Sequence, residues 1–146
     1  MEPMEIALQE ARAAAARGEV PVGAVVLASD GTVLARAGNR VEATHDASAH
    51  AELLAMRAAA ATRGSARLPD CDLVVTLEPC PMCAQAIGFF RIRRLIFGAY
   101  DPKGGGVEHG ARVFDASSCH HRPEVVGGVR ETEAAGLLKA FFAGKR

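Results

Sequence analysis

The stretch LVVTLEPCPMC, residues 73–83, organises the rest of the chain. Its first part, residues 73–77, is a short apolar run rich in β-branched residues, which predicts a buried central strand. Pro81 then stands where helices accept proline, in the first turn, so a helix is expected to follow. Cys80 and Cys83 are three residues apart, and at a helix start this spacing puts both sulfurs on one face. The stretch therefore predicts a strand that leads into a helix carrying two candidate metal ligands.

Strands and helices are expected to alternate along the chain. The predicted helices cover residues 4–17, 49–61, 81–90 and 131–142, and the predicted strands cover residues 20–27, 32–37, 73–77, 95–99 and 125–129. The second helix is expected to have Ser48 as its N-cap and to face the core with Leu53, Leu54 and Met56. A single α/β domain over residues 1–146 with three layers follows from this alternation.

Two connecting segments and the last helix carry further expectations. Residues 42–46 are predicted to be a polar loop. Residues 101–122 are rich in glycine and polar residues, and a loop of this length is expected to be functional or partly ordered by short helices. The terminal helix is expected to place its larger apolar residues on one side, namely Leu137, Leu138, Phe141 and Phe142.

The composition is that of an ordinary globular protein, with 49% hydrophobic residues. No apolar run approaches the ~20 residues that a membrane span needs, and the N-terminus lacks a signal-peptide pattern, so a cytoplasmic location is expected. Residues 1–90 hold 7 basic and 11 acidic residues, a balance of −4, whereas residues 91–146 hold 10 and 6, a balance of +4. A basic C-terminal part fits either a polyanionic partner or an ordinary solvated surface.

A third candidate ligand, His50, opens the predicted second helix, and Glu52 follows two residues later. Thiolates and a neutral imidazole are ligands that zinc prefers, and a helix N-terminus favours the thiolate form. The cysteines are therefore expected to be free rather than disulfide-bonded. Three protein ligands without an evident fourth leave one tetrahedral position for water, which is typical of a catalytic zinc. Glu52 could move protons to and from that water. A zinc-stabilised binding module without catalysis is the alternative.

These motifs carry a family resemblance. His50-Ala51-Glu52 with Pro79-Cys80-Pro81-Met82-Cys83 resembles the H-x-E…P-C-x-x-C signature of zinc-dependent deaminases. Within the cytidine/deoxycytidylate deaminase superfamily, the chain resembles the bacterial tRNA-specific adenosine deaminases over nearly its whole length, through residues 19–24, 38–40, 76–80, 97–103 and the terminal helix. The resemblance implies a three-layer cytidine deaminase-like fold with a central mixed sheet of about five strands flanked by helices. It also implies one Zn²⁺ per subunit, held by His50, Cys80 and Cys83, with Glu52 as the catalytic proton shuttle.

The resemblance further implies a reaction and a substrate. The implied reaction is hydrolytic deamination of adenosine to inosine at the wobble position of the tRNA anticodon, by attack of zinc-bound hydroxide on C6. The implied substrate-binding residues are Asn39, Val22, Ala51, Asp101 and Lys103. The implied partners are the tRNA anticodon stem-loop and a second copy of the chain in a homodimer, with no membrane. A deaminase of a free nucleobase or nucleoside, of guanine or cytosine type, is the alternative.

Two clusters keep two interpretations each. Residues 119–121, Cys-His-His, could be a second metal site, although a surface loop is favoured. Arg91, Arg93 and Arg94 form either a phosphate-contacting cluster or a solvated surface at a dimer edge. Cys71 is expected to be a small buried residue.

Overall fold

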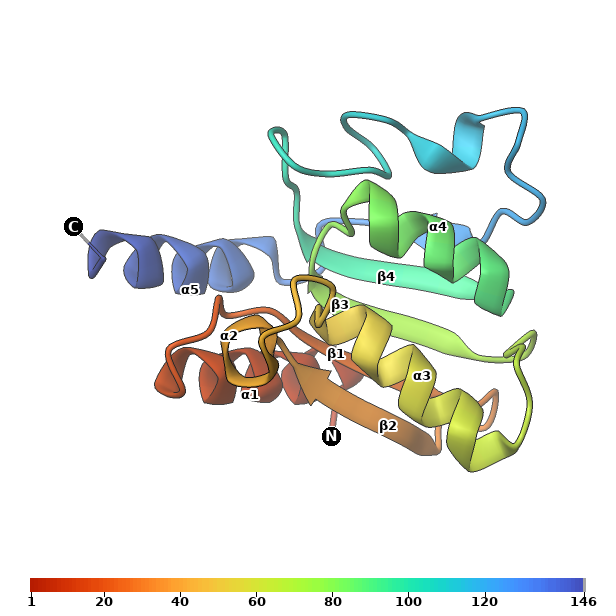
Figure 1. The fold of residues 1–146 in the computed structure, drawn as a ribbon, viewed down its shortest axis with the longest axis horizontal. Helices are drawn as coiled ribbons and strands as arrows, with labels where there is room; N and C mark the ends of the chain where they lie inside the picture. The colour runs from red at the N-terminus through yellow and green to blue at the C-terminus, as the bar shows by residue number, and fades with distance from the viewer. Residues whose placement is uncertain (146) are drawn as a thin grey trace.

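The structure is a computed structural model that describes residues 1–145, and its centre is one five-stranded mixed sheet (Figure 1). The strands lie in the order β2-β1-β3-β4-β5. Their bounds are Gly23–Leu27 for β1, Val33–Gly38 for β2, Asp72–Leu77 for β3, Arg94–Ala99 for β4 and Glu124–Val126 for β5. Strand β1 pairs antiparallel with β2 and β3, whereas β3 with β4 and β4 with β5 are parallel. The predicted central position of β3 is confirmed.

Helices cover both faces of this sheet. Their bounds are Pro3–Ala16 for α1, Val41–Thr44 for α2, Ala51–Arg63 for α3, Pro81–Phe90 for α4 and Glu131–Ala143 for α5, with a 3₁₀ turn, η1, over Val113–Asp115. Helices α3 and α4 pack on one face, and α1 and α5 pack on the other (Figure 1). The predicted three-layer α/β fold is therefore confirmed. Within residues 1–145, no helix is both long and apolar enough to cross a membrane.

The central strand contributes to two separate cores. Leu73 and Val75 of β3 pack with the α3 and α4 side, whereas Val74 packs with the α1 side. Successive side chains of a strand point to opposite faces, so a strand covered on both sides has no polar alternation. This explains why residues 73–77 form a continuous apolar run.

Helix α3 begins two residues later than predicted. Ser48 is not its N-cap, because the Ser48 hydroxyl donates to Asp46 Oδ1 at 2.7 Å and His50 takes the N-cap position. The predicted core-facing side was right for Met56, which is fully buried, but Leu53 and Leu54 are only partly buried. The buried stripe consists mainly of small residues that let the helix approach the sheet closely, namely Ala51, Ala55 and Ala59.

Three other expectations were corrected. The predicted loop over residues 42–46 contains the short helix α2. Strand β5 ends at Val126, before Gly127 and Gly128, and Gly128 adopts a positive φ of 82°. Phe142 was expected on the apolar side of α5, but it is 55% exposed.

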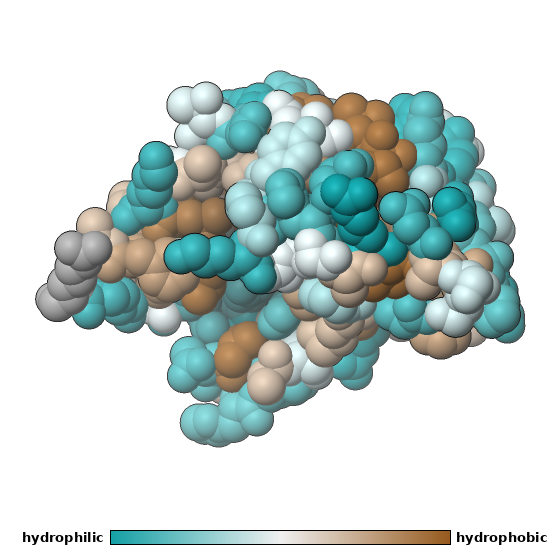
Figure 2. All heavy atoms as spheres, turned by 90° about the horizontal axis from the view of Figure 1, so that it is seen from above, coloured by the Kyte–Doolittle hydropathy of each residue, from teal (hydrophilic) through white to brown (hydrophobic). Residues whose placement is uncertain are grey.

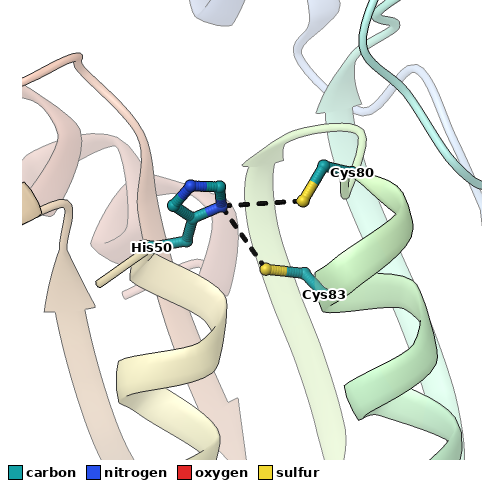
Figure 3. A group of neighbouring side chains, drawn as sticks. All are labelled: His50, Cys80 and Cys83. Carbon is teal, nitrogen blue, oxygen red and sulfur yellow. Dashed lines mark hydrogen bonds between the residues drawn. The ribbon is translucent and has the colours of Figure 1, made fainter. Parts of the chain in front are cut away.

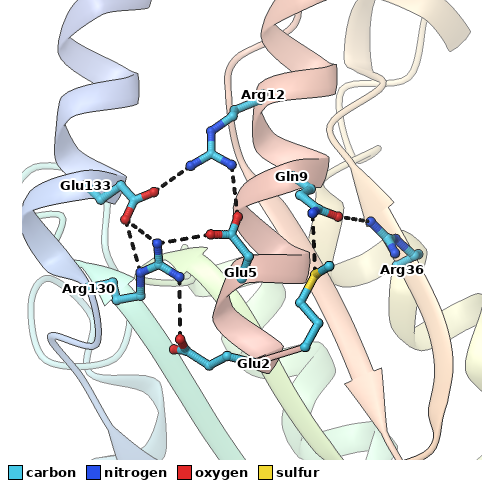
Figure 4. Close-up of polar contacts among 8 residues, drawn as sticks. Glu2, Glu5, Gln9, Arg12, Arg36, Arg130 and Glu133 are labelled. Atoms are coloured by element: carbon cyan, nitrogen blue, oxygen red, sulfur yellow. Dashed lines mark hydrogen bonds and ion pairs between the residues drawn. The ribbon is translucent and has the colours of Figure 1, made fainter.

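Helix α5 is held to α1 by an ion-pair network (Figure 4). The Arg130 guanidinium donates to Glu5 Oε1 at 3.1 Å and also pairs with Glu133. Arg12 donates to Glu5 Oε2 at 3.0 Å and pairs with Glu133 from the other side. Ala134 is the sole fully buried residue of α5, and Ala135, Leu137 and Leu138 are partly buried against the cores, so these ion pairs add to an apolar attachment of the helix.

Candidate active site

Two helix N-termini meet beside the central strand and bring three potential metal ligands together (Figure 3). His50 is the N-cap of α3, Cys80 is the N-cap of α4, and Cys83 lies in the first turn of α4. The His50 Nδ1 atom is 3.6 Å from Cys80 Sγ and 3.6 Å from Cys83 Sγ. All three ligand atoms lie within 4.8 Å of one another.

These separations fit a tetrahedral zinc ion. With Zn–S distances of ~2.3 Å and Zn–N distances of ~2.0–2.1 Å, a nitrogen and a sulfur ligand are separated by about 3.6 Å along the edge of a tetrahedron. The two measured N–S separations agree with this value. One nitrogen and two sulfurs are also the donor set that zinc prefers, and they leave a fourth position for water.

The same geometry controls the protonation of the ligands. A hydrogen bond from the Cys83 thiol, and further contact with His50, lower the pKa of Cys80 to about 4 despite burial. The pKa of Cys83 is raised, first because its thiol donates to Cys80 and then because it is buried. Both sulfurs lie at the positive end of the α4 dipole, which stabilises a thiolate. Cys80 therefore favours the thiolate form that binds a metal cation, whereas a bound cation would have to displace the proton of Cys83.

Glu52 lies one helical position beyond Ala51, and its side chain faces the same pocket as His50. It is 4% exposed, and burial raises its pKa to about 7 from an ordinary 4.5. A carboxyl group with a pKa near neutrality can both accept and release a proton under physiological conditions. This is the property that hydrolytic chemistry at the neighbouring metal position requires.

A pocket of about 580 Å³ opens beside these residues. Its lining comes from the segment before β1, the segment after β2, α2, the starts of α3 and α4, the segments at the ends of β3 and β4, and the C-terminal part of the chain. The lining residues are Gly18, Glu19, Val20, Val22, Asn39, Val41, Glu42, His50, Glu52, Leu77, Glu78, Cys80, Asp101, Gly104, Phe141 and Lys145. A cavity of this size can hold a nucleoside-sized ligand.

The structure brings most of the predicted substrate-binding residues to this pocket. Val22, Asn39 and Asp101 line it, whereas Lys103 is exposed and lies outside the lining. Ala51 is fully buried, and its backbone N–H donates to Asn39 Oδ1 at 2.7 Å. Because that oxygen holds the start of α3, the Asn39 NH₂ group is the part of its side chain that can donate to a bound molecule. The substrate-binding roles of these residues stay predictions.

Two buried carboxylates of the pocket were missed in the sequence. Glu19 accepts the backbone N–H groups of Glu42 and Ala43 at the start of α2, at 3.1 and 2.8 Å. Glu78 accepts several backbone N–H groups of the segment after β4. A charged residue directly after the apolar run 73–77 was a signal for Glu78, because carboxylates are seldom buried without partners.

The remaining clusters do not form a second centre. Among residues 1–145, the group of His50, Cys80 and Cys83 is the one set of three or more candidate ligands that could hold a metal ion. The Cys119 thiol instead donates to the His121 carbonyl at 3.1 Å, so the metal interpretation of residues 119–121 lacks support.

The other cysteine and the arginines also have structural explanations. Cys71 is fully buried as predicted, and burial raises its pKa to about 11. Arg93 pairs with Asp72 at 2.9 Å and Arg94 pairs with Glu124 at 2.6 Å. Because these pairs lie at the opposite ends of β3 and β4 from the pocket, they favour the solvated-surface interpretation.

Comparison with known proteins agrees with this geometry. Residues 1–99 match the cytidine and deoxycytidylate deaminase zinc-binding region. The tRNA-specific adenosine deaminase of Agrobacterium fabrum is 56% identical over 98% of this chain and 93% of its own length. A solved structure from work on A-to-I editing by tRNA:A34 deaminases at the wobble position has a TM-score of 0.91 and 55% identity, and the match covers 93% of this chain and 98% of that one.

A guanine deaminase from Nitrosomonas europaea is a more distant structural relative. Its structure has a TM-score of 0.83 and 25% identity, with 97% of this chain and 83% of that chain covered. The matched region is a zinc-binding one, so zinc is the ion for which His50, Cys80 and Cys83 are placed.

Proposed function

This chain belongs to the cytidine and deoxycytidylate deaminase family, and from that premise we propose that it deaminates adenosine to inosine at the wobble position of a tRNA anticodon. The observation that carries the proposal is a buried carboxyl group, Glu52, beside a zinc-binding triad at the base of a nucleoside-sized pocket. The 56% identity to a tRNA-specific adenosine deaminase supports the choice of substrate. The cytoplasmic location predicted above is consistent with a tRNA substrate.

The mechanism assigns proton transfer to Glu52. His50, Cys80 and Cys83 would hold one zinc ion per subunit, and the bound ion would supply Lewis acidity that lowers the pKa of a water molecule. The Glu52 carboxylate takes a proton from the attacking water and delivers it to N1 of adenine. Glu52 then takes the remaining proton from the new hydroxyl group on C6 and passes it to the exocyclic amino group as the bond from C6 to nitrogen breaks. Water and adenosine are thereby converted to inosine and ammonia.

The pocket rim offers contacts suited to an RNA loop. Phe141 and Lys145 of the C-terminal segment line the pocket, and Lys145 Nζ lies 4.9 Å from the centre of the Phe141 ring. Aromatic rings can stack on unpaired bases and a lysine can contact phosphate. The face seen in Figure 2 is mostly hydrophilic, with separate hydrophobic patches between the polar side chains. We assign substrate contacts in the pocket to Val22, Asn39 and Asp101, and a contact outside it to the exposed Lys103, with the anticodon stem-loop as the bound part of tRNA. The buried Ala51 would contribute by fixing the Asn39 side chain through its backbone N–H.

An exposed apolar surface supports the predicted homodimer. Met82 and Phe89 are 40% and 65% exposed, and their spacing of seven residues puts them on one side of α4. Leu53 and Leu54 of the neighbouring α3 are only partly buried. A second copy that covers this side would remove these residues from water. Sedimentation analysis should give a dimer for the native chain and a monomer for Phe89→Glu, and a monomeric native chain would contradict the assembly.

An anticodon stem-loop with adenosine at the wobble position tests the activity. We expect inosine to form, and no product from a matched stem-loop with guanosine at that position. Glu52→Ala should remove activity while zinc stays at one ion per chain, because Glu52 is not needed as a ligand. Turnover by this variant would contradict the proton-transfer role, and a zinc content well below one per native chain would contradict the metal site.

A free-base deaminase is the second candidate, because the Nitrosomonas guanine deaminase shares the fold. Free guanine, cytosine and adenosine should be assayed beside the stem-loop by ammonia release. Release from a free base without inosine formation in the stem-loop would overturn the tRNA proposal in favour of this one.

A further inference from the structure

We propose that Glu78 is a positioning residue for substrate binding: its buried carboxylate anchors the pocket wall formed by residues 101–109 onto the helix that carries the cysteine ligands. The identity of the substrate rests on the proposed function, whereas the anchoring itself can be measured without it. The loop 101–109 follows β4, and Asp101 and Gly104 of this loop line the pocket.

Both carboxylate oxygens of Glu78 accept hydrogen bonds from the segment after β4. Its Oε2 atom accepts three successive backbone N–H groups, from Val107 at 3.2 Å, Glu108 at 2.9 Å and His109 at 3.0 Å. Successive N–H groups that converge in this way form an anion-binding nest, which Glu78 fills from inside the protein. Its Oε1 atom accepts the Asp101 N–H at 3.0 Å and contacts His109 Nδ1 at 2.9 Å.

These contacts exclude a direct chemical role for Glu78. Two carboxylate oxygens offer about four acceptor sites, and five donors already occupy them. The side chain is 0% exposed. A saturated carboxylate has no free acceptor for substrate or metal, so its effect passes through the loop.

The adjacent glycines make this close approach possible. A Cβ atom at Gly105 would lie 2.4 Å from Glu78 Oε2. A Cβ atom at Gly106 would lie 2.6 Å from the Pro81 nitrogen and 2.8 Å from the Cys80 carbonyl carbon. The Gly106 N–H also donates to the Pro79 carbonyl at 2.8 Å. The Gly104-Gly105-Gly106 run is thereby explained: the loop lies directly on the start of α4.

The anchor is connected to the pocket through Asp101. Glu78 holds the Asp101 backbone, and Asp101 Oδ1 in turn accepts the N–H groups of Gly104 at 2.9 Å and Lys103 at 3.3 Å. Without the Glu78 carboxylate, Asp101 and Gly104 lose their fixed position in the wall. The loop still meets the start of α4 through the Gly106 N–H and the Pro79 carbonyl, a contact that does not involve the carboxylate, and α3 and α4 place His50, Glu52 and Cys83. Substrate affinity is therefore expected to fall while the chemical step is preserved.

Glu78→Gln tests this inference, with Glu108→Gln as the matched control. Gln has the same shape, but its NH₂ group cannot accept the N–H groups that it would face. Glu108 is an exposed carboxylate on the same loop, so its replacement removes the same charge without removing an anchor. For Glu78→Gln we expect KM for the stem-loop to rise by at least about tenfold, which corresponds to about 1.4 kcal/mol, since charge-assisted hydrogen bonds that fix the wall are lost. The kcat value and the zinc content should stay near those of the native chain, and Glu108→Gln should match the native chain throughout.

Trypsin cleavage after Lys103 measures the anchoring independently of activity. Lys103 is exposed and followed by Gly104, and we expect faster cleavage there in Glu78→Gln but not in Glu108→Gln. His109→Ala removes one donor and keeps the carboxylate, and it should give a smaller increase in both KM and cleavage if Glu78→Gln does not fold. An unchanged cleavage rate, or loss of kcat and zinc with KM unchanged, would overturn the inference. If the native chain forms no inosine, the proposed function fails, while the cleavage rates still decide the anchoring.

Discussion

Replacing Glu19 by Gln should loosen the part of the pocket wall that α2 contributes. Glu19 is 2% exposed and accepts the backbone N–H groups of Glu42 and Ala43. Helix α2 has only four residues, Val41–Thr44. A helix this short has no stability of its own, because the cost of nucleation is not recovered. Its position therefore depends on external contacts such as the Glu19 carboxylate.

The expected loss of stability follows from these two bonds. Hydrogen bonds to a charged acceptor contribute about 1.5–3 kcal/mol each, and a neutral Gln oxygen recovers about 1 kcal/mol of one bond. Glu19→Gln should therefore lower the free energy of unfolding by roughly 2–5 kcal/mol at neutral pH, out of a total of about 5–15 kcal/mol for a typical domain. KM for the stem-loop should also rise, because Val41 and Glu42 of α2 line the pocket.

The pH dependence has a definite sign. Burial alone would raise the pKa of Glu19, but the N–H groups of Glu42 and Ala43 outweigh it and hold the pKa below its ordinary value of 4.5. A carboxylate with a lowered pKa in the folded state contributes its full stability above the unfolded-state pKa, and that contribution is lost as the pH falls through the folded-state pKa. The difference between the native chain and Glu19→Gln should therefore be complete at neutral pH and shrink below pH 4.5.

Urea denaturation at neutral pH and well below pH 4.5 measures this difference. Glu42→Gln is the control, because Glu42 is an exposed carboxylate on α2 whose backbone N–H, not its side chain, contacts Glu19. It should unfold at nearly the same urea concentration as the native chain. A Glu19→Gln variant within about 0.5 kcal/mol of the native chain at neutral pH, the range of ordinary surface substitutions, would refute the reasoning. So would a large difference that persists at low pH.

Three further substitutions test the packing. Phe97 is fully buried, and its ring packs edge-to-face on Tyr100 with the ring centroids 5.1 Å apart. Phe97→Ala should therefore lower the free energy of unfolding in urea by about 3–5 kcal/mol. A decrease under 1 kcal/mol would contradict its place in the core. Gly136 lies inside α5, and no atom lies within 4 Å of a Cβ atom added there. Gly136→Ala should therefore raise the free energy of unfolding by about 0.5–1 kcal/mol. A decrease would contradict the open space at this position. Arg130→Ala removes the ion pairs with Glu5 and Glu133. Because salt screens such pairs, the variant should have a lower Tm than the native chain at low salt, with a smaller difference at high salt. A Tm difference that does not depend on salt would contradict a role of these ion pairs in holding α5.

Local patterns predicted the principal elements well, because they depend on neighbouring residues. The apolar run 73–77 is buried on both faces of the sheet, and Pro81 begins α4. The start of α3 was predicted less well. His50 has an extended backbone and is the N-cap of α3. The N–H of the next residue, Ala51, donates to Oδ1 of Asn39, which is twelve residues earlier in the chain. The sequence of residues 48–52 alone cannot predict a hydrogen bond to such a distant residue.

The sequence by itself determined the ligand chemistry, because one imidazole and two thiolates are characteristic zinc ligands whatever brings them together. The tertiary structure decided how the pKa values of the buried carboxyl groups differ. Glu52 has few partners, and burial raises its pKa to about 7. Glu19 and Glu78 instead accept backbone N–H groups from segments 23 to 31 residues away, and their pKa values are lowered. The physical reason is that a carboxylate's charge state depends on the donors around it, and only the folded chain brings those donors to each side chain.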